Sequence, residues 1–181
     1  RTGVTPSAVG FNYATSDGTA LTADSDYVAA SGTGTIPSGG ATGTTAVSVT
    51  INGDAFFENN ETFNVNLSAP TNAAISDGTG VGTITNDDIA PVLTISDQTV
   101  TEGNSGTVPM VFTITRTGLT KLPATAAYAS ADGTATAPSD YTAVNGTATV
   151  AADTQNVATT TVTVLVNGDT TIEGNETLFL N

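Results

Sequence analysis

The sequence contains no cysteine, no histidine and no tryptophan. Without cysteine and histidine, the chain has no disulfide, no thiol nucleophile, no Ser-His-Asp triad and no ligand set for zinc or a soft metal. Paired carboxylates could in principle hydrolyse a glycosidic bond, but aromatic side chains on which a sugar ring could stack are few. The composition therefore indicates a protein that is not an enzyme.

Basic residues are almost as scarce, because Arg1, Arg116 and Lys121 stand against 17 acidic residues and the net charge is −14. A chain with this charge is repelled by nucleic acid and by anionic membrane surfaces. No run approaches the roughly 18–20 apolar residues of a membrane span, so membrane insertion is not expected. Metal cations are the natural counter-charge. The richness in Thr, Ala, Gly, Ser and Asn favours an exported protein of a bacterial cell surface.

The most informative stretch is an acidic loop between two apparent strands. Apolar and polar residues alternate over 47–51 and again over 63–67, and this period of two predicts a half-buried β-strand on each side. The loop between them carries Asp54, Glu58 and Glu61 and no basic residue. The loop is therefore a candidate cation site.

The same strand–loop–strand pattern recurs over residues 166–181, at an offset of about 115 residues. In the same alignment residues 13–20 match 128–135, and residues 1–3 match 116–118. A repeat of this length is too long for one unit of a solenoid, and it suits a whole β-sandwich domain.

Two domains are therefore expected, residues 1–89 and 90–181. Segment 92–115 has no counterpart in the first copy, and segment 68–89 has none in the second. The first domain is expected to lack its first strands and the second its last strands, as in a piece of a longer array. Because open sheet edges recruit strands, neighbouring repeats or neighbouring chains are expected partners.

Short runs rich in Thr and Val, separated by Gly, Asn, Asp, Ser and Pro clusters, predict an all-β fold with two-sheet sandwiches. No window shows helical periodicity with caps. The expected strands lie near 8–15, 32–36, 45–51, 62–67 and 79–86 in the first copy, and near 92–96, 98–101, 108–116, 124–131, 146–150, 158–166 and 176–180 in the second.

Four motifs follow one another in the first copy: Tyr13-Ala-Thr-Ser-Asp-Gly-Thr-Ala20, Ser25-Asp-Tyr27, the acidic loop and Asn86-Asp-Asp88. The second copy repeats the first three and adds Glu102-Gly103 near its start. This order of motifs resembles Calx-beta repeats, twice over nearly the whole chain. The resemblance implies two tandem immunoglobulin-like antiparallel β-sandwiches, each incomplete at one end, with Ca²⁺ bound in loops at one end of the sandwich.

The resemblance also implies the calcium ligands, residue by residue. In the first copy they are Asp17, Asp54, Glu58, Glu61, Asp87 and Asp88, and in the second Glu102, Asp132, Asp169, Glu173 and Glu176. The chain departs from the family's strongest calcium binders at Gly53-Asp54 and Gly168-Asp169, where those have consecutive aspartates.

Several residues have a second interpretation. Crowded carboxylates repel one another unless a cation neutralises them, but an acidic loop can also be a solvated surface. Asp17 and Asp132 each precede glycine, so they are either ligands or turn residues. Asp26 and Asp140 each precede tyrosine, and we expect them to bond local backbone while the tyrosine packs in the core.

The leading functional hypothesis is a calcium-binding structural or adhesive module of an exported bacterial surface protein. Ca²⁺ at the domain ends would stiffen it as a stalk or spacer, since Asp87 and Asp88 lie on the short linker between the copies. One alternative is a subunit of an extracellular filament assembled by strand complementation. Another is a calcium-sensing regulatory domain, against which the loss of the paired aspartates argues.

Overall fold

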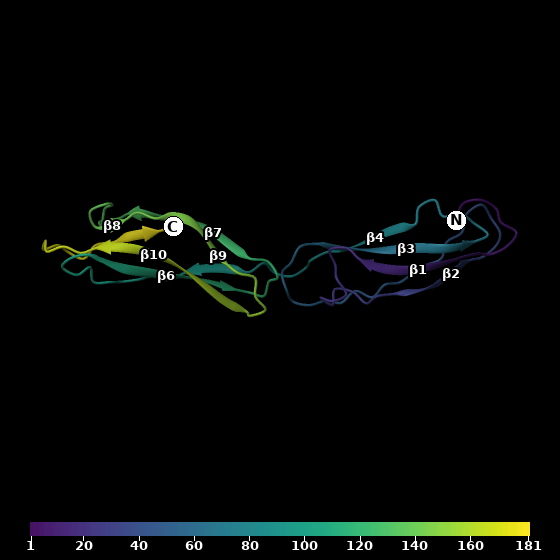
Figure 1. Cartoon of the computed structure of the whole chain (residues 1–181), viewed down its shortest axis with the longest axis horizontal. Coiled ribbons are helices and arrows are strands. Elements are labelled where there is room, and N and C mark those ends of the chain that lie inside the picture. The colour runs from purple at the N-terminus through teal and green to yellow at the C-terminus, as the bar shows by residue number, and fades with distance from the viewer. The chain divides into compact units, whose positions relative to one another are not determined.

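A computed structural model of the chain describes residues 1–181 and contains β-strands without any helix (Figure 1). Every pairing between its strands is antiparallel. The predicted all-β class is therefore confirmed. No helix long and apolar enough to cross a membrane is present.

The chain divides into two compact units. The first consists of residues Arg1–Asp54 and Asn59–Asp87, and the second of Ala55–Glu58 and Asp88–Asn181. The four residues Ala55–Glu58 thus belong to the second unit although they lie within the first copy of the repeat. There the backbone N–H of Phe57 donates to the Leu119 carbonyl at 3.1 Å, and the Lys121 N–H donates to the Phe57 carbonyl at 3.1 Å.

The first unit is built on one four-stranded antiparallel sheet in the order β2-β1-β3-β4. Its strands are β1 (Val9–Asp17), β2 (Ser31–Ile36), β3 (Glu61–Thr71) and β4 (Thr79–Ile84). On one face of the sheet Tyr27 stacks on Phe63, with ring centroids 4.7 Å apart, and both residues are buried beside Ala20.

In the first unit two aromatic rings lie over glycines of the neighbouring strand. Phe11 pairs with Gly34 across β1 and β2, and Phe63 pairs with Gly82 across β3 and β4. A Cβ at Gly34 or Gly82 would run into the facing ring. Because the glycine has no side chain, the ring lies flat on its backbone and covers it from solvent.

The second unit is a two-sheet sandwich. One sheet has the order β5-β6-β10-β8 and the other β11-β7-β9. The strands are β5 (Val92–Ile95), β6 (Thr107–Thr117), β7 (Ala124–Asp132), β8 (Tyr141–Thr142), β9 (Asn145–Val150), β10 (Val157–Asn167) and β11 (Leu178–Leu180). Ile114 of β6, Val162 of β10 and Val150 of β9 pack in one core cluster, which closes the sandwich.

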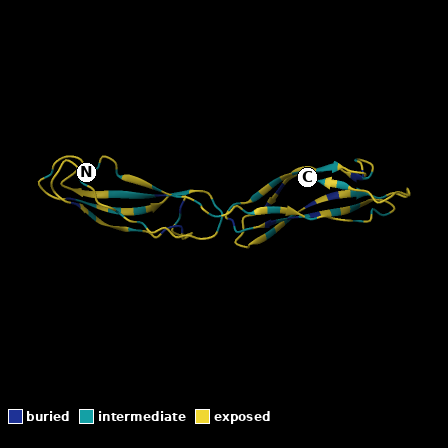
Figure 2. Ribbon diagram, turned by 180° about the vertical axis from the view of Figure 1, so that it is seen from behind, coloured by how far each residue is buried: buried dark blue, intermediate teal, exposed yellow.

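The second unit has the larger core. Eight of its hydrophobic residues are buried, against five in the first unit. Figure 2 colours the buried residues dark blue. The difference follows from the strands present: β6 pairs with β10 over eleven residues, and the first unit has no counterpart of β5 and only Arg1–Gly3 in place of β6.

Two of the expected strands are wrong. Residues 45–51 form no ladder, and only Ile51 makes a bridge, to Tyr27. Their counterpart in the second unit is β10, whose main partner is β6, and without such a partner the alternating sequence cannot close hydrogen bonds. Residues 98–101 are likewise part of no strand pairing.

Candidate metal centres

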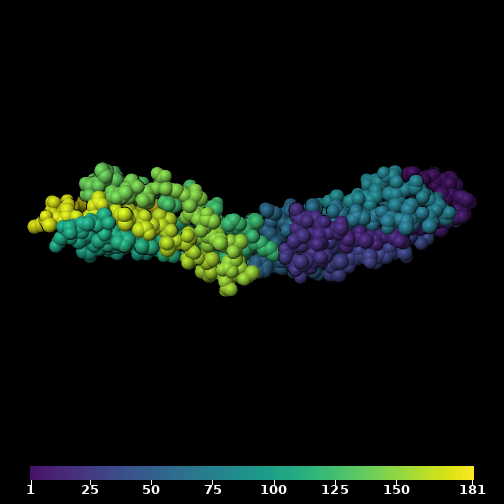
Figure 3. Space-filling view, viewed as in Figure 1, coloured from purple at the N-terminus to yellow at the C-terminus, as the bar shows by residue number.

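The second unit brings three carboxylates together. Oxygens of Asp140, Glu173 and Glu176 lie within 4.8 Å of one another. Asp140 directly precedes β8, whereas the two glutamates lie on the loop between β10 and β11, whose residues 169–177 are exposed at the surface of this unit (yellow in Figure 3). Glu102 completes the surroundings, since it lines the same cavity of about 270 Å³.

The electrostatics of this group favour a bound cation. Partial loss of hydration among its neighbours raises the pKa of Glu173, and the nearby carboxylates of Glu176, Asp169, Asp140 and Glu102 raise it further. Each of these neighbours makes a negative charge on Glu173 more costly, so a proton or a metal ion is attracted to the position. A set composed only of oxygen donors suits a hard cation such as Ca²⁺ or Mg²⁺ rather than zinc.

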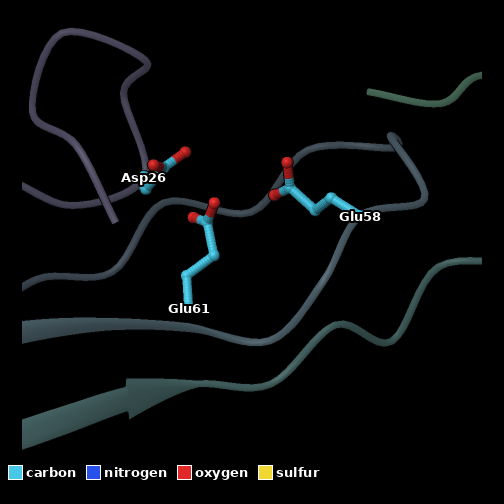
Figure 4. Close-up of side chains that lie close together, drawn as sticks. All are labelled: Asp26, Glu58 and Glu61. Carbon is cyan, nitrogen blue, oxygen red and sulfur yellow. The ribbon is translucent and has the colours of Figure 1, made fainter. Parts of the chain in front are cut away.

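The first copy of the repeat contains a matching group. Oxygens of Asp26, Glu58 and Glu61 lie within 4.8 Å of one another, and Figure 4 shows the three side chains pointing toward a common space. Asp26 is buried, and its Oδ2 accepts the N–H of Leu21 at 2.8 Å. The buried carboxylate is therefore held in place by the backbone before any ion binds.

Glu58 differs from its counterpart Glu173 in having a basic neighbour. The Lys121 ammonium lies 2.7 Å from Glu58 Oε2, and the Glu58 side chain is 18% exposed while that of Lys121 is 34% exposed. An ammonium at this distance compensates part of the negative charge. A metal ion at this group therefore competes with the lysine for Glu58, which is a constraint that the second group does not share at Glu173.

Asp17 and Asp132 occupy the same place in the two copies, at the ends of β1 and β7. Asp17 Oδ1 accepts the hydroxyl of Tyr27 at 2.6 Å, and Asp132 Oδ1 accepts that of Tyr141 at 2.6 Å. These hydrogen bonds are the main cause that lowers the pKa of both aspartates. Gly18, the residue after Asp17, packs so closely against the Thr62 carbonyl that no Cβ would fit there.

These contacts favour the turn interpretation of Asp17 and Asp132. Neither residue belongs to a group of three close carboxylates. Their hydrogen bonds tie the Asp-Gly turn to the buried tyrosine and so fix the chain that carries the next aspartate. A direct role of Asp17 and Asp132 as calcium ligands stays a prediction.

The remaining predicted ligands lie around the two groups. Asp169 accepts the N–H of Thr171 at 2.6 Å and, with Glu102, raises the pKa of Glu173. Asp54, Asp87 and Asp88 belong to neither group, so their role as ligands also stays a prediction.

Sequence reasoning assigned Asp26 and Asp140 a structural role only. The expected backbone bonds are present, since Asp140 Oδ2 accepts the Thr136 N–H at 2.7 Å, and the following tyrosines Tyr27 and Tyr141 are buried. What the reasoning missed is that both carboxylates also enter the acidic groups. The sequence feature that could have pointed to this second role is the exact recurrence of Ser-Asp-Tyr in both copies.

Comparison with known proteins identifies one family. The family model described as Calx-beta domain matches residues 1–88 and again 86–181. The crystal structure of CBD12 from CALX1.2 has 20% sequence identity and a TM-score of 0.45, covering 100% of this chain and 70% of that one. The crystal structure of calcium binding domain CBD12 of CALX1.1 also has 20% sequence identity and a TM-score of 0.45, and the match covers 90% of this chain and 64% of that one. No curated protein matches the chain.

Proposed function

Because the chain belongs to the Calx-beta family, with one domain in each half, we propose that it is a calcium-binding structural module. The observation that carries the proposal is the group Asp140, Glu173 and Glu176, whose oxygens lie within 4.8 Å of one another. Ca²⁺ takes six to eight oxygen ligands, and Glu102, backbone carbonyls and water would supply those that the three carboxylates do not.

A bound ion would act as a clamp within the second unit. It would join the exposed loop 169–177 to the start of β8 and to Glu102, three stretches that are far apart in the sequence. In the absence of the ion these carboxylates repel one another. Calcium therefore converts a mutually repelling edge into a cross-linked one, as a rigid spacer requires.

The setting that we propose is an exported bacterial surface protein, in which tandem modules form a stalk or an adhesive spacer. The support is compositional: the chain has 17 acidic and three basic residues, no cysteine, and many Thr, Gly and Ala residues. A module of this kind works in a calcium-rich medium and needs only weak sites, with dissociation constants of about 10⁻⁴–10⁻³ M.

The test is thermal unfolding with calcium and with chelator. A ligand that binds only the native state must raise the unfolding midpoint, so calcium is expected to raise it in the parent chain. Glu173→Gln should remove most of that increase. Asp77→Asn makes the same charge change on the loop between β3 and β4, at the end of β3 opposite to Glu61, and should keep the increase. A midpoint that calcium leaves unchanged would refute the calcium function.

The same variant has a second expected effect. Because the pKa of Glu173 is raised, its charged form costs stability at pH values above that pKa, and protonation recovers the loss as the pH falls through it. Without calcium at pH 7, Glu173→Gln should therefore be more stable than the parent. Lower stability would contradict the electrostatic account of the group.

Affinity separates the structural function from calcium sensing. A sensor requires dissociation constants of about 10⁻⁷–10⁻⁵ M and a conformational change, and calorimetry would detect the first directly. Lys121→Gln removes the ammonium next to Glu58 and is expected to tighten binding at the first group. Unchanged affinity there would show that the lysine does not compete with the ion.

A second candidate function is that of a filament subunit joined to its neighbours by strands. It is favoured by one observation, the outer edges of β2 and β4, which bound the sheet of the first unit and pair with no further strand, because open sheet edges recruit strands. The two functions are compatible, because the acidic groups and these edge strands are built from different residues.

A further inference from the structure

Asn167, the last residue of β10, is bonded to the stretch of chain that carries Asp140. Its backbone N–H donates to the Asp140 carbonyl at 2.8 Å. Its side-chain Nδ2 donates to the carbonyls of Pro138 and Ser139, at 2.9 and 2.8 Å. An amide NH₂ group has two hydrogens, so each of the two carbonyls receives one. Asn167 therefore fixes the backbone from which the Asp140 carboxylate projects.

The first unit contains the same arrangement. Asn52 is the counterpart of Asn167, and its Nδ2 donates to the Ser25 carbonyl at 2.7 Å. Its backbone N–H donates to the Asp26 carbonyl at 3.1 Å. Since the same bonds hold the aspartate of both acidic groups, they are a feature of the repeat and not of one copy alone.

Gly168, the residue after Asn167, brings in a third stretch of chain. Its N–H donates to the Gly106 carbonyl at 2.9 Å. A Cβ at this position would lie 2.5 Å from the Glu102 carbonyl oxygen and 2.9 Å from that of Gly103. Both distances are too short for a non-bonded contact, so the backbone would have to move. The absence of a side chain at 168 therefore allows the backbone of Glu102 to approach the end of β10.

Asn167 and Gly168 thus join the two distant stretches that complete the acidic group of the second unit. Asp140 lies on one of these stretches and Glu102 on the other, and both line the same cavity of about 270 Å³. The loop 169–177, which carries the two glutamates, begins directly after this pair. Every carboxylate of the group is therefore placed relative to the same two residues.

We propose that Asn167 and Gly168, with Asn52 as the counterpart of Asn167 in the first unit, are positioning residues for calcium, and that an added carboxylate at these positions weakens calcium binding. This inference rests on the proposed calcium function. Charge alone predicts the opposite, because a further carboxylate beside the group attracts a cation more strongly.

The physical reason differs between the two positions. Asn167→Asp turns two oxygens toward two backbone carbonyls, which lose their donor and repel the new carboxylate. The stretch that carries Asp140 is then no longer held in place. Gly168→Asp brings a Cβ against the Glu102 carbonyl, so that Glu102 is displaced from the cavity.

The test is a calcium titration of the full chain, followed by the amide chemical shifts of residues 169–177 in nuclear magnetic resonance spectra. These shifts report the affinity of this group separately from the first. Asn167→Asp and Gly168→Asp should each raise the dissociation constant at least about tenfold, because loss of the groups that orient metal ligands lowers affinity by about 10–100-fold. Gly174→Asp adds the same charge on the same loop, where a Cβ meets no atom within 4 Å, and should preserve or tighten binding.

Two uncharged variants separate positioning from a general loss of stability. Asn167→Ala removes both side-chain hydrogen bonds and Gly168→Ala adds only the Cβ, and each should also raise the dissociation constant at least about tenfold. Affinities are compared at a temperature at which the spectrum in chelator shows a folded chain. A merely structural role would lower the unfolding midpoint in chelator and leave the dissociation constant of the folded chain unchanged, which would overturn the proposal. If the variants at 167 and 168 do not fold, Asn52→Ala gives the same test at the amides of Ser25 and Asp26.

Tighter or unchanged binding in Asn167→Asp or Gly168→Asp, in a parent chain that does bind calcium, would overturn this inference and leave the calcium function standing. The inference also fails if Gly174→Asp weakens binding as strongly, because any added charge on the loop would then have the same effect. A parent chain whose amides do not respond to calcium would refute the calcium function and this inference with it.

Discussion

Replacing Val164 with alanine is expected to destabilise the second unit far more than the equivalent change Val49→Ala destabilises the first. The two valines hold the same place in the repeat. Val164, on β10, has none of its surface exposed and packs with Phe112 and Tyr141. Val49 is half-buried and only borders the cluster of Tyr27 and its neighbours.

The magnitudes follow from burial. Alanine at position 164 loses two methyl groups, each contributing about 0.8 kcal/mol when buried. A residual cavity of roughly 40 Å³ adds about 1 kcal/mol at about 24 cal/mol per Å³, so the expected loss is about 2.5 kcal/mol. At Val49 less buried apolar area is removed, because this side chain is only half-buried. The free energy of unfolding is therefore expected to fall by less than about 1 kcal/mol.

The assay is urea unfolding of each variant, followed by circular dichroism, with amide exchange assigning each transition to its unit. If the slope of the unfolding free energy against urea concentration is unchanged, the substitution has left the denatured state unaffected. Equal losses for the two variants would refute the reasoning. They would mean that residues 45–51 are as tightly packed as β10.

Two further predictions concern the turns and the sheet. Tyr141→Phe removes the hydroxyl that lowers the pKa of Asp132. A lowered carboxyl pKa stabilises the fold above the unfolded value of about 3.9 and ceases to do so as the pH falls through the folded pKa. The variant should therefore be less stable than the parent at pH 7, and unfolding at decreasing pH should show the difference vanishing in acid. Gly34→Val pushes against the ring of Phe11 and should cost about 1–3 kcal/mol in urea unfolding, whereas Gly40→Val, which meets no atom within 4 Å, should be nearly neutral.

Most of the strands could be predicted because their signal is local. Alternation of apolar and polar residues predicted β1, β3, β6 and β10 to within a few residues. The same signal failed at 45–51, because alternation reports which side chains could be buried and not whether another strand is there to bond.

The candidate metal sites likewise depend partly on the local sequence and partly on the fold. Glu58 and Glu61, like Glu173 and Glu176, are three residues apart on one loop, so their proximity could be expected from the sequence. The third member of each group arrives from an earlier turn. Asp140 precedes Glu173 by more than the length of β10, and nothing in the local sequence distinguishes it from an aspartate that only caps a turn.

By itself, the sequence determined the all-β class, the twofold repeat, the acidic loops and the exclusion of thiol and histidine chemistry, because composition and periodicity are properties of the chain that no packing can alter. Only the tertiary structure decided which carboxylates meet, where a lysine already compensates one of them, and that residues 45–51 form no ladder. These depend on contacts between residues far apart in the chain, and such contacts exist only where the fold supplies a partner. The two copies have nearly the same local sequence pattern, but only the second contains β6. The second unit therefore has the larger buried core and the ladder between β6 and β10.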